Sequence, residues 1–318
     1  MRKRRTDAGQ PDWRSFAERM FDGALMVDPD LRVVFWNAAA QQLAGWSAEE
    51  MVGRTLPADL LVRIPGEAAE SPSGIEPLAE TLRAGEPRDA DAWLRHRQGH
   101  LLPVRLRTLA VPGTGGRTAG AVGILSDNTP RIVIQRQTEE LEEEAPLEPL
   151  TGLGDRVAAE RALERRLDGL RLHGVPLALA LVDPDGLARI NDRAGREAGD
   201  RVLRMVARTL YHGVRSGTDA VYRWGGEEFV VLARLAGGEP LRRFCEKLRQ
   251  LVERSGFDGP DGRVDVTVSI GATRAAPDDT PELLVRRAEA WMVRSKEGGG
   301  NRVTCEPEPP ALPPVEEG

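Results

Sequence analysis

Apolar runs separated by turn residues predict five short strands in the first 129 residues. The strands are predicted at residues 23–27, 32–36, 92–97, 101–110 and 119–125. Residues 13–20 and 38–43 have helical spacing, and Ser47 with Glu50 forms the capping box of another helix. The glycine-rich segment 113–120 joins two strands without a helix behind it, which indicates a turn rather than a phosphate-binding loop. Strands with short helices between them predict a small α+β domain.

From residue 148 onward, longer helices alternate with longer apolar strands. Helices are predicted at residues 157–172, which Asp155 is placed to cap, and at residues 202–210. Between them lies the apolar run 177–182, a buried strand that leads directly to Asp183. A carboxylate after a buried strand is well placed to bind a metal ion, because the strand fixes it while the loop beyond stays open. A cap of the following turn is the alternative role.

Two glycines and two glutamates lie between a pair of apolar runs, which predicts a β-hairpin with acids at its tip. Gly225 and Gly226 supply the positive φ of a tight turn, and without side chains they let the phosphates of a ligand approach the backbone. Glu227 and Glu228 point to opposite faces of the hairpin, so at least one projects toward whatever fills the turn. A surface hairpin with solvated glutamates fits the isolated motif equally well.

Three segments are predicted to lie outside the two domains. Residues 1–12 are predicted to be a flexible basic terminus, and residues 305–318, rich in proline and glutamate, a disordered tail. Residues 130–147 are predicted to form a charged helix with few apolar positions, which would bury too little to stand alone and would therefore be a connector. Paired with a second copy it would form a short coiled coil, and a solvated linker helix fits the same pattern.

The 318-residue chain is 40% hydrophobic and 30% charged, a balance typical of soluble globular proteins. Its longest apolar run is far shorter than a membrane span, and no apolar signal region follows its basic start, so we expect a cytoplasmic protein. The net charge of −6 gives no support for a nucleic-acid partner. Cys245 and Cys305 form no CxxC or Cys/His pattern, which suggests neither a disulfide framework nor a zinc site.

Four motifs follow one another within residues 13–129: Asp22-Gly23-Ala24-Leu25-Met26-Val27-Asp28, Phe35-Trp36-Asn37-Ala38-Ala39-Ala40, residues 45–53 and Asp127-Asn128-Thr129. Their order resembles that of the PAS family. This resemblance implies a five-stranded antiparallel sheet with short helices that senses a ligand, light or redox state, or that dimerises. The region has no cysteine for a flavin adduct, and His96 and His100 lie by a strand turn rather than on the middle helix where PAS haem ligands usually lie. The PAS ligand is therefore left open.

A second set of motifs lies within residues 148–304: Leu150-Thr151-Gly152-Leu153 with Arg156, Asp183 with Asp185, Ile190-Asn191-Asp192 with Gly195, Gly199-Asp200, Gly225-Gly226-Glu227-Glu228-Phe229, Ser269-Ile270-Gly271, and Lys296 with Gly299 and Asn301. In this order they resemble the GGDEF family, the diguanylate cyclases. The resemblance implies a central sheet flanked by helices, similar to the catalytic core of class III nucleotide cyclases. It also implies that two GTP molecules are joined into cyclic di-GMP with release of pyrophosphate. Receptors of cyclic di-GMP would then act downstream.

The resemblance implies roles for individual residues. Mg²⁺ or Mn²⁺ would be held by Asp183, Glu227, Glu228 and the carbonyl of Pro184, which proline keeps although it lacks an N–H. Glu227 would in addition accept the proton of the attacking 3′-hydroxyl. Lys296 would meet the β- and γ-phosphates, with an exposed helix lysine as the alternative.

Asn191 and Asp200 match the guanine readers of the family. A carboxylate accepts hydrogen bonds from the N1–H and amino group of guanine, and adenine offers no N1–H, so Asp200 would favour GTP over ATP. Gly225, Gly226 and Arg196 complete the expected substrate contacts.

Several positions depart from the family pattern. Ala188 stands where a lysine is usual, Arg196 where a histidine is usual, and Gly300 where an arginine is usual. Arg294, Arg302 and Arg196 itself are the candidates to compensate for the lost cations. We expect a raised KM or slower turnover rather than loss of metal chemistry, since the acids are intact.

Many family members bind the product at an Arg-x-x-Asp site that ends six residues before the first glycine of the signature. Here that register reads Ser216-Gly217-Thr218-Asp219, with Arg215 one position early. We therefore expect weak or absent product inhibition through this site.

Because each such domain holds one GTP and the product is two-fold symmetric, the resemblance implies a homodimer. The PAS domain and the linker helix would set the geometry of that dimer. The alternative is a catalytically weak or inactive GGDEF module that binds GTP or cyclic di-GMP for signalling. The intact acids favour the enzyme.

Overall fold

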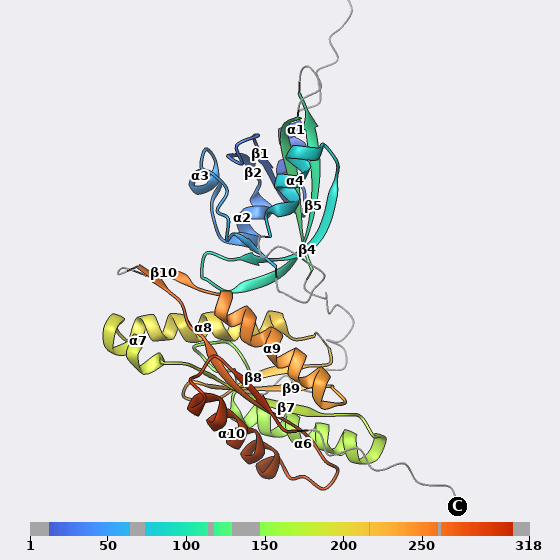
Figure 1. The fold of residues 1–318 in the computed structure, drawn as a ribbon, viewed down its shortest axis with the longest axis vertical. Helices are drawn as coiled ribbons and strands as arrows, with labels where there is room; N and C mark the ends of the chain where they lie inside the picture. Colours follow the sequence, from blue (N-terminus) through green and yellow to red (C-terminus); the bar gives the residue numbers. More distant parts are fainter. Residues whose placement is uncertain are drawn as a thin grey trace, which may run out of the picture. The chain divides into compact units, whose positions relative to one another are not determined.

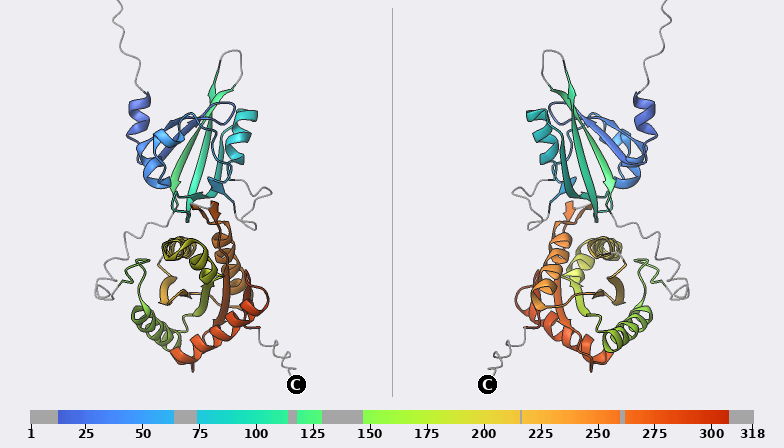
Figure 2. Two further views of the ribbon diagram at one scale, coloured as in Figure 1. Left: turned by 90° about the vertical axis from the view of Figure 1, so that its left-hand side faces the viewer. Right: turned by 90° about the vertical axis from the view of Figure 1, so that its right-hand side faces the viewer.

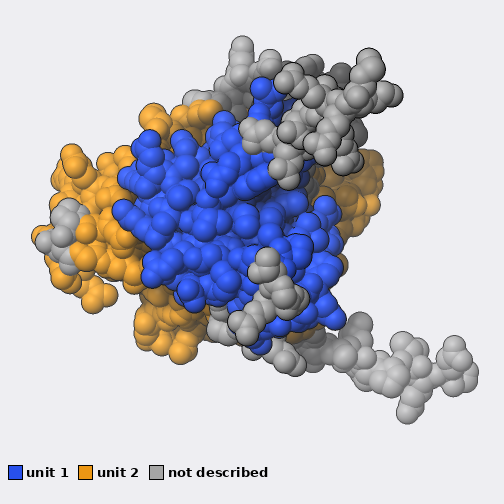
Figure 3. All heavy atoms as spheres, turned by 90° about the horizontal axis from the view of Figure 1, so that it is seen from above, with its two compact units in different colours: residues 1–97, 103–128 blue, residues 98–102, 129–318 orange. Residues whose placement is uncertain are grey.

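The computed structural model describes residues 13–63, 74–113, 118–128, 147–215, 217–259 and 262–307. The predicted basic terminus, the linker helix through residue 146 and the predicted tail from residue 308 lie outside the described residues. The chain divides into two compact units, residues 1–97 with 103–128 and residues 98–102 with 129–318 (Figure 3). Within the described part of the chain, no helix is both long enough and apolar enough to cross a membrane.

The first unit is built on a six-stranded sheet with the order β2-β1-β6-β5-β4-β3. Its strands are β1 (Gly23–Val27), β2 (Val33–Trp36), β3 (Leu61–Val62), β4 (Arg88–Arg95), β5 (Leu101–Pro112) and β6 (Thr118–Asp127). The pairs β1–β2, β1–β6, β5–β6 and β3–β4 are antiparallel. The sequence predicts five of these strands. The sixth, β3, is only two residues long and therefore too short to show an alternating pattern.

Short helices accompany this sheet: α1 (Trp13–Glu18), α2 (Ala38–Ala44), α3 (Ala48–Met51) and α4 (Glu76–Ala84). The capping box of α3 is confirmed, because Ser47 accepts a hydrogen bond from the Glu50 N–H and Glu50 accepts one from the Ser47 N–H. The sequence does not predict α4. This helix follows Ile75 and has no side-chain cap, so the usual signal for a helix start is absent.

Asn37 is a buried polar anchor of the first unit and is 1% exposed. Its Oδ1 accepts hydrogen bonds from the N–H groups of Ala24 and Ala40, both at 2.8 Å. Its Nδ2 donates to the carbonyls of Ala17, at 2.9 Å, and Asp22, at 3.1 Å. One side chain therefore caps α2 and ties it to β1 and to the segment that precedes β1.

The second unit contains a five-stranded sheet with the order β13-β12-β7-β9-β8 (Figure 1). These strands are β7 (Ala178–Pro184), β8 (Ala220–Gly225), β9 (Glu228–Ala233), β12 (Val268–Arg274) and β13 (Val303–Cys305), and β10 (Phe257–Gly259) with β11 (Gly262–Val264) forms a separate hairpin. β7 pairs antiparallel with both β9 and β12, and β13 runs parallel to β12. β7 is therefore the central strand, and every residue of it is buried.

Helices cover both faces of this sheet, as Figures 1 and 2 show. They are α6 (Arg156–His173), α7 (Leu187–Ala194), α8 (Arg196–Gly213), α9 (Gly238–Arg254) and α10 (Pro281–Glu297). On one face, Leu179 and Leu181 of β7 share a core with residues of α6 and α10, while α8 and α9 pack together on the other. Strand residues alternate between the faces, so β7 fills both cores. A central sheet flanked by helices is the architecture that the sequence predicts for this region.

The ordered part of the second unit extends past the predicted domain end at residue 304. Cys305 is the last residue of β13, and the N–H of Glu306 donates to the carbonyl of Ala272 at 3.0 Å. The prediction that the tail begins at residue 305 is therefore wrong, because parallel pairing with β12 continues through Cys305.

Candidate functional site

Asp183 is a buried carboxylate on the central strand of the second unit. It lies in β7 opposite Ser269 of β12 and is 3% exposed. Its Oδ2 is 2.7 Å from Nζ of Lys296, which lies in the last turn of α10. Its Oδ1 is buried and has no hydrogen-bond partner among the described residues. Since a buried carboxylate oxygen without a partner is costly, this atom marks a place where a further cation would be stabilised.

The two glycines and two glutamates form the turn between β8 and β9, as the sequence predicts. Gly225 pairs with Glu228, so Gly226 and Glu227 form the connection between the strands. Only Gly226 of the two glycines has a positive φ, at 52°. A Cβ placed on either glycine would have no atom of the described residues within 4 Å. The tip of the hairpin is therefore open to an approaching group.

Three carboxylates share one electrostatic environment at this end of the sheet. Burial raises the pKa of Asp183, and the ammonium group of Lys296 opposes that rise. The pKa values of Glu227 and Glu228 are also raised, first by burial and then by the negative charge of Asp183. Glu289 of α10 adds to the effect on Glu228. The fold thus brings the predicted acids together with Lys296.

The chemistry of these groups fits a divalent cation. No three His, Cys, Asp or Glu side chains in the described ranges are arranged to hold a metal ion by themselves. The predicted ligand set therefore depends on a backbone carbonyl, that of Pro184 at the end of β7, in addition to the acids. Carboxylate and carbonyl oxygens are the hard ligands that Mg²⁺ and Mn²⁺ prefer. The unpartnered Oδ1 of Asp183 is the structural observation that supports this fit.

Asn191 and Asp200 lie on consecutive helices, α7 and α8, which meet at Gly195. A Cβ on Gly199 would come within 1.9 Å of the Asn191 Oδ1, so glycine is needed to make room for this amide next to Asp200. Arg196, the first residue of α8, is exposed. The two predicted guanine readers are therefore brought to one helix junction.

Asp185 has a structural role that the sequence does not reveal. Its carboxylate accepts hydrogen bonds from the hydroxyls of Thr267 and Ser269, at 2.7 and 2.6 Å, and from the N–H of Asn301, at 2.8 Å. Gly300 has a φ of 73°, and a Cβ there would lie 3.1 Å from this carboxylate. The loop after α10 is therefore built around glycine at a position where the family usually has arginine.

Two of the three arginines named as candidates to compensate lie near the end of α10: Arg294 in its last turn and Arg302 in the loop that follows. The guanidinium of Arg294 lies 4.4 Å from the centre of the Trp291 ring. The Nη1 atom of Arg302 lies beside Gly298, because a Cβ added to Gly298 would be 2.6 Å from this atom. Within the described residues, it is Lys296 rather than either arginine that forms an ion pair with Asp183.

Glu148 and Arg223 connect the start of the second unit to the hairpin, and the sequence predicts no role for them. Nη1 of Arg223 donates to Glu148 Oε2 at 2.9 Å, and Nε of Arg223 donates to the Gly226 carbonyl at 3.1 Å. Burial alone would raise the pKa of Glu148, but hydrogen bonds from Thr151, Leu150 and Arg223 outweigh it and lower the pKa to about 2. Glu148 and Arg223 are 75 positions apart in the sequence, so their ion pair is a tertiary contact that the sequence does not reveal.

Asp219 is occupied by structural contacts. Its side chain is fully buried, and it accepts hydrogen bonds from the Arg215 guanidinium, at 3.0 and 3.2 Å, and from the Arg234 N–H, at 3.0 Å. Arg215 is in turn held by the carbonyl of Arg234, at 3.0 Å. Arg215 and Asp219, the arginine and aspartate of the shifted Arg-x-x-Asp site, therefore bind each other.

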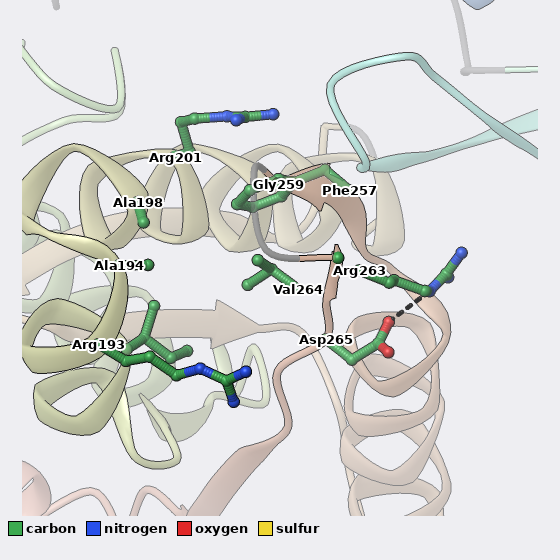
Figure 4. Close-up of a pocket in the computed structure, with 11 residues that line it drawn as sticks. Arg193, Ala194, Ala198, Arg201, Phe257, Gly259, Arg263, Val264 and Asp265 are labelled. Atoms are coloured by element: carbon green, nitrogen blue, oxygen red, sulfur yellow. Dashed lines mark hydrogen bonds and ion pairs between the residues drawn. The ribbon is translucent and has the colours of Figure 1, made fainter.

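A cavity of about 170 Å³ lies between α7, α8 and the β10–β11 hairpin (Figure 4). Its lining includes Arg193 and Arg201, and the guanidinium of Arg201 lies 4.0 Å from the centre of the Phe257 ring. Neither Asn191 nor Asp200 lines it. Ile190 and Ala198, which precede Asn191 and Gly199 in the chain, do line it, so the cavity borders the helix junction that carries the two predicted guanine readers.

Comparison with protein families matches both parts of the chain. Residues 145–302 match the family described as diguanylate cyclase, GGDEF domain, and residues 18–132 match the PAS fold. Diguanylate cyclase DgcP of Pseudomonas aeruginosa is 34% identical over 165 residues, which are 52% of this chain and 24% of DgcP. Response regulator PleD of Caulobacter vibrioides is 37% identical over 162 residues, which are 50% of this chain and 36% of PleD.

A solved structure is similar to the same part of the chain. The structure of diguanylate cyclase SiaD in complex with its activator SiaC, from Pseudomonas aeruginosa, matches with a TM-score of 0.51 and 29% identity. The match covers 54% of this chain and 66% of SiaD. This chain spans 24% of the length of DgcP and 36% of that of PleD.

We expect Glu148→Gln to lower the free energy of unfolding by about 3 kcal/mol near pH 7, because a neutral amide replaces a carboxylate stabilised by four hydrogen bonds. The ordinary pKa of 4.5 is lowered to about 2, so the ionised form stabilises the fold above pH 4.5. That contribution is lost as the pH falls from 4.5 to about 2.

Chemical denaturation of both proteins at several pH values measures this effect. The difference between Glu148→Gln and the unmodified protein should be largest near neutral pH and shrink on acidification. Glu164→Gln, at an exposed position of α6, is the matched control and should show no such difference. A difference for Glu148→Gln that does not change with pH would contradict the assignment.

Proposed function

Because residues 145–302 form a GGDEF domain and residues 18–132 a PAS domain, we propose that this protein condenses two GTP molecules into cyclic di-GMP and pyrophosphate. The observation that carries the proposal is the buried, unpartnered Oδ1 of Asp183 beside Glu227 and Glu228. These acids lie next to an open glycine turn, so the charge of a triphosphate would meet a cation site. The relatives DgcP and SiaD, both named diguanylate cyclases, support the same reaction.

The proposed divalent cation, Mg²⁺ or Mn²⁺, would be held by Asp183, Glu227, Glu228 and the Pro184 carbonyl. The cation would neutralise part of the phosphate charge and would lower the pKa of the attacking 3′-hydroxyl. Glu227 lies at the tip of the turn, and its carboxylate would accept the proton of the 3′-hydroxyl. Lys296 would exchange its contact with Asp183 for the β- and γ-phosphates once the acids have another counter-charge.

Guanine would be read at the junction of α7 and α8. The Asp200 carboxylate would accept from the N1–H and amino group of guanine, and the Asn191 amide can both donate and accept. Gly199 supports this assignment, because the room it leaves holds the Asn191 amide next to Asp200. Arg196 would extend from the start of α8 toward the substrate. Preference for GTP over ATP follows from the absence of an N1–H donor in adenine.

We infer that the active form is a homodimer, because each unit would supply one GTP site and the product has two equivalent halves. The PAS domain and the residues that join it to the second unit would set how often the two sites meet. A second candidate is a module that binds GTP or cyclic di-GMP with little or no synthesis. Gly300 favours this alternative, since its φ of 73° and its approach to Asp185 leave no place for the usual arginine.

Full-length protein incubated with GTP and Mg²⁺ should yield cyclic di-GMP, detected by chromatography. Glu227→Gln should reduce the rate by at least about 100-fold, because the amide neither binds the cation as well nor accepts the proton. GTP binding should persist in the variant. Glu164→Gln is the matched control and should keep the full rate. Equal rates for Glu227→Gln and the control would remove Glu227 from the mechanism, and GTP binding without product from the unmodified protein would favour the binding module.

The specific activity of the full chain should rise with protein concentration, because two copies must meet. Residues 148–304 alone should be less active than the full chain when both are assayed at the same low concentration, since the PAS domain and linker are absent. The idea that these parts set the dimer would fail if the two proteins were equally active.

Cyclic di-GMP should bind the full-length protein equally in the presence and absence of an Asp219→Asn substitution, as measured by calorimetry. The reason is that Asp219 already accepts hydrogen bonds from Arg215 and the Arg234 N–H. Circular dichroism checks that the variant is folded. A tight complex that is lost in the folded variant would show that the shifted register does bind the product.

A further inference from the structure

Cys245 and Cys305, the only two cysteines of the chain, meet in the fold although they are far apart in the sequence. Cys245 lies in α9 and Cys305 ends β13, the edge strand against which α9 packs. The Cys245 thiol donates a hydrogen bond to the Cys305 sulfur, and both cysteines are reduced. A buried residue touches about 6–12 others, so chance would bring two given residues of this chain together only about 3% of the time.

We propose that Cys245 and Cys305 are a redox modification site that hydrogen peroxide converts into an intramolecular disulfide. The Cys245 thiol is already in hydrogen-bond contact with the Cys305 sulfur, so the two side chains need only approach further for an S–S bond to form. β13 is three residues long and lies at the edge of the sheet, so a small shift of this strand disturbs few neighbours.

The two thiols differ in access and in acidity. Cys305 is 8% exposed, whereas Cys245 is completely buried. The hydrogen bond from Cys245 lowers the pKa of Cys305 against the opposing effect of burial, and the charge of Arg242 lowers it further. The same hydrogen bond, together with burial, raises the pKa of Cys245 well above its ordinary value. Cys305 is therefore the thiol that peroxide reaches and that more readily forms the reactive thiolate.

The chemistry proceeds in two balanced steps. The Cys305 thiolate attacks one oxygen of hydrogen peroxide and the O–O bond breaks. Hydroxide departs, and Cys305 becomes a sulfenic acid. The Cys245 sulfur then attacks the Cys305 sulfur, the S–O bond breaks, and the thiol proton leaves with the hydroxyl as water. The hydroxide from the first step takes up the proton that the Cys305 thiol released, so in total two thiols lose two electrons and one hydrogen peroxide becomes two molecules of water. A dithiol reductant reverses the reaction by thiol–disulfide exchange.

The disulfide would enclose β12 and α10 within one covalent loop, because both elements lie between the two cysteines. That loop contains Lys296 and the segment that follows it. Closing a loop of this length removes entropy from the unfolded chain and so stabilises the second unit. The oxidised protein is therefore expected to resist thermal unfolding more than the reduced protein.

Full-length protein treated with hydrogen peroxide under native conditions, then alkylated in denaturant and digested, tests the proposal by mass spectrometry. A peptide that links Cys245 to Cys305 is expected, together with loss of both free thiols, reversal by dithiothreitol and a rise in Tm of at least about 5 °C. The Cys245→Ala/Cys305→Ala double variant should show no rise. Two thiols that stay free, or disulfides formed only between chains, would overturn the proposal.

Single variants test the order of reaction with dimedone, which traps sulfenic acids. Cys245→Ala should accumulate a dimedone adduct on Cys305, whereas Cys305→Ala should leave Cys245 unreacted. Circular dichroism checks the fold of each variant, and Cys245→Ser replaces Cys245→Ala if the alanine variant is unfolded. Labelling of Cys245 in folded Cys305→Ala at the rate seen for Cys305 would overturn the assigned roles.

Discussion

A buried carboxylate that requires positive charge is the constraint on which the second unit depends. Asp183 lies on the central strand, where neighbouring strands on both sides and helices on both faces remove it from water. Such a group destabilises a fold by several kcal/mol unless a counter-charge is held against it. Lys296 meets that requirement from the last turn of α10, and one carboxylate oxygen remains without a partner in the described structure. A cation bound beside the unpartnered oxygen of Asp183 would therefore stabilise the folded protein.

Two further carboxylates hold the segments around Asp183 together through hydrogen bonds. Asp185 joins the end of β7 to β12 and to the loop after α10 through Thr267, Ser269 and Asn301. Glu148 joins the start of the second unit to Arg223, which in turn holds the carbonyl of Gly226. Since Glu227 follows Gly226 directly, the first residues of the second unit and the acidic turn belong to one hydrogen-bonded network.

Departures from the family pattern are accommodated by specific contacts. Gly300 stands where an arginine is usual, and the left-handed backbone there brings the loop against Asp185. The Arg-x-x-Asp site of the family has its arginine one position early in this chain, at Arg215, and Arg215 forms an ion pair with Asp219. In both cases, the residues of this chain make contacts that support its fold: the Gly300 backbone lies against Asp185, and Arg215 forms an ion pair with Asp219.

The sequence by itself determined the features that depend on local spacing. Apolar runs bounded by turn residues predicted most strands, Ser47 and Glu50 marked a helix start, and the glycine pair marked the turn between β8 and β9. Because these signals arise within a few residues, they can be recognised without knowledge of the fold. The two-residue strand β3 and the uncapped helix α4 lacked such a signal.

Only the tertiary structure decided which distant residues meet. The contacts of Lys296 with Asp183, Arg223 with Glu148, and Cys245 with Cys305 join segments that no sequence period relates. Each depends on how helices pack on the sheet, and packing is set by the shapes of all the buried side chains together. The residue types predicted the chemistry that this protein could carry, and the packing of α9 and α10 on the sheet decided which of those groups come into contact.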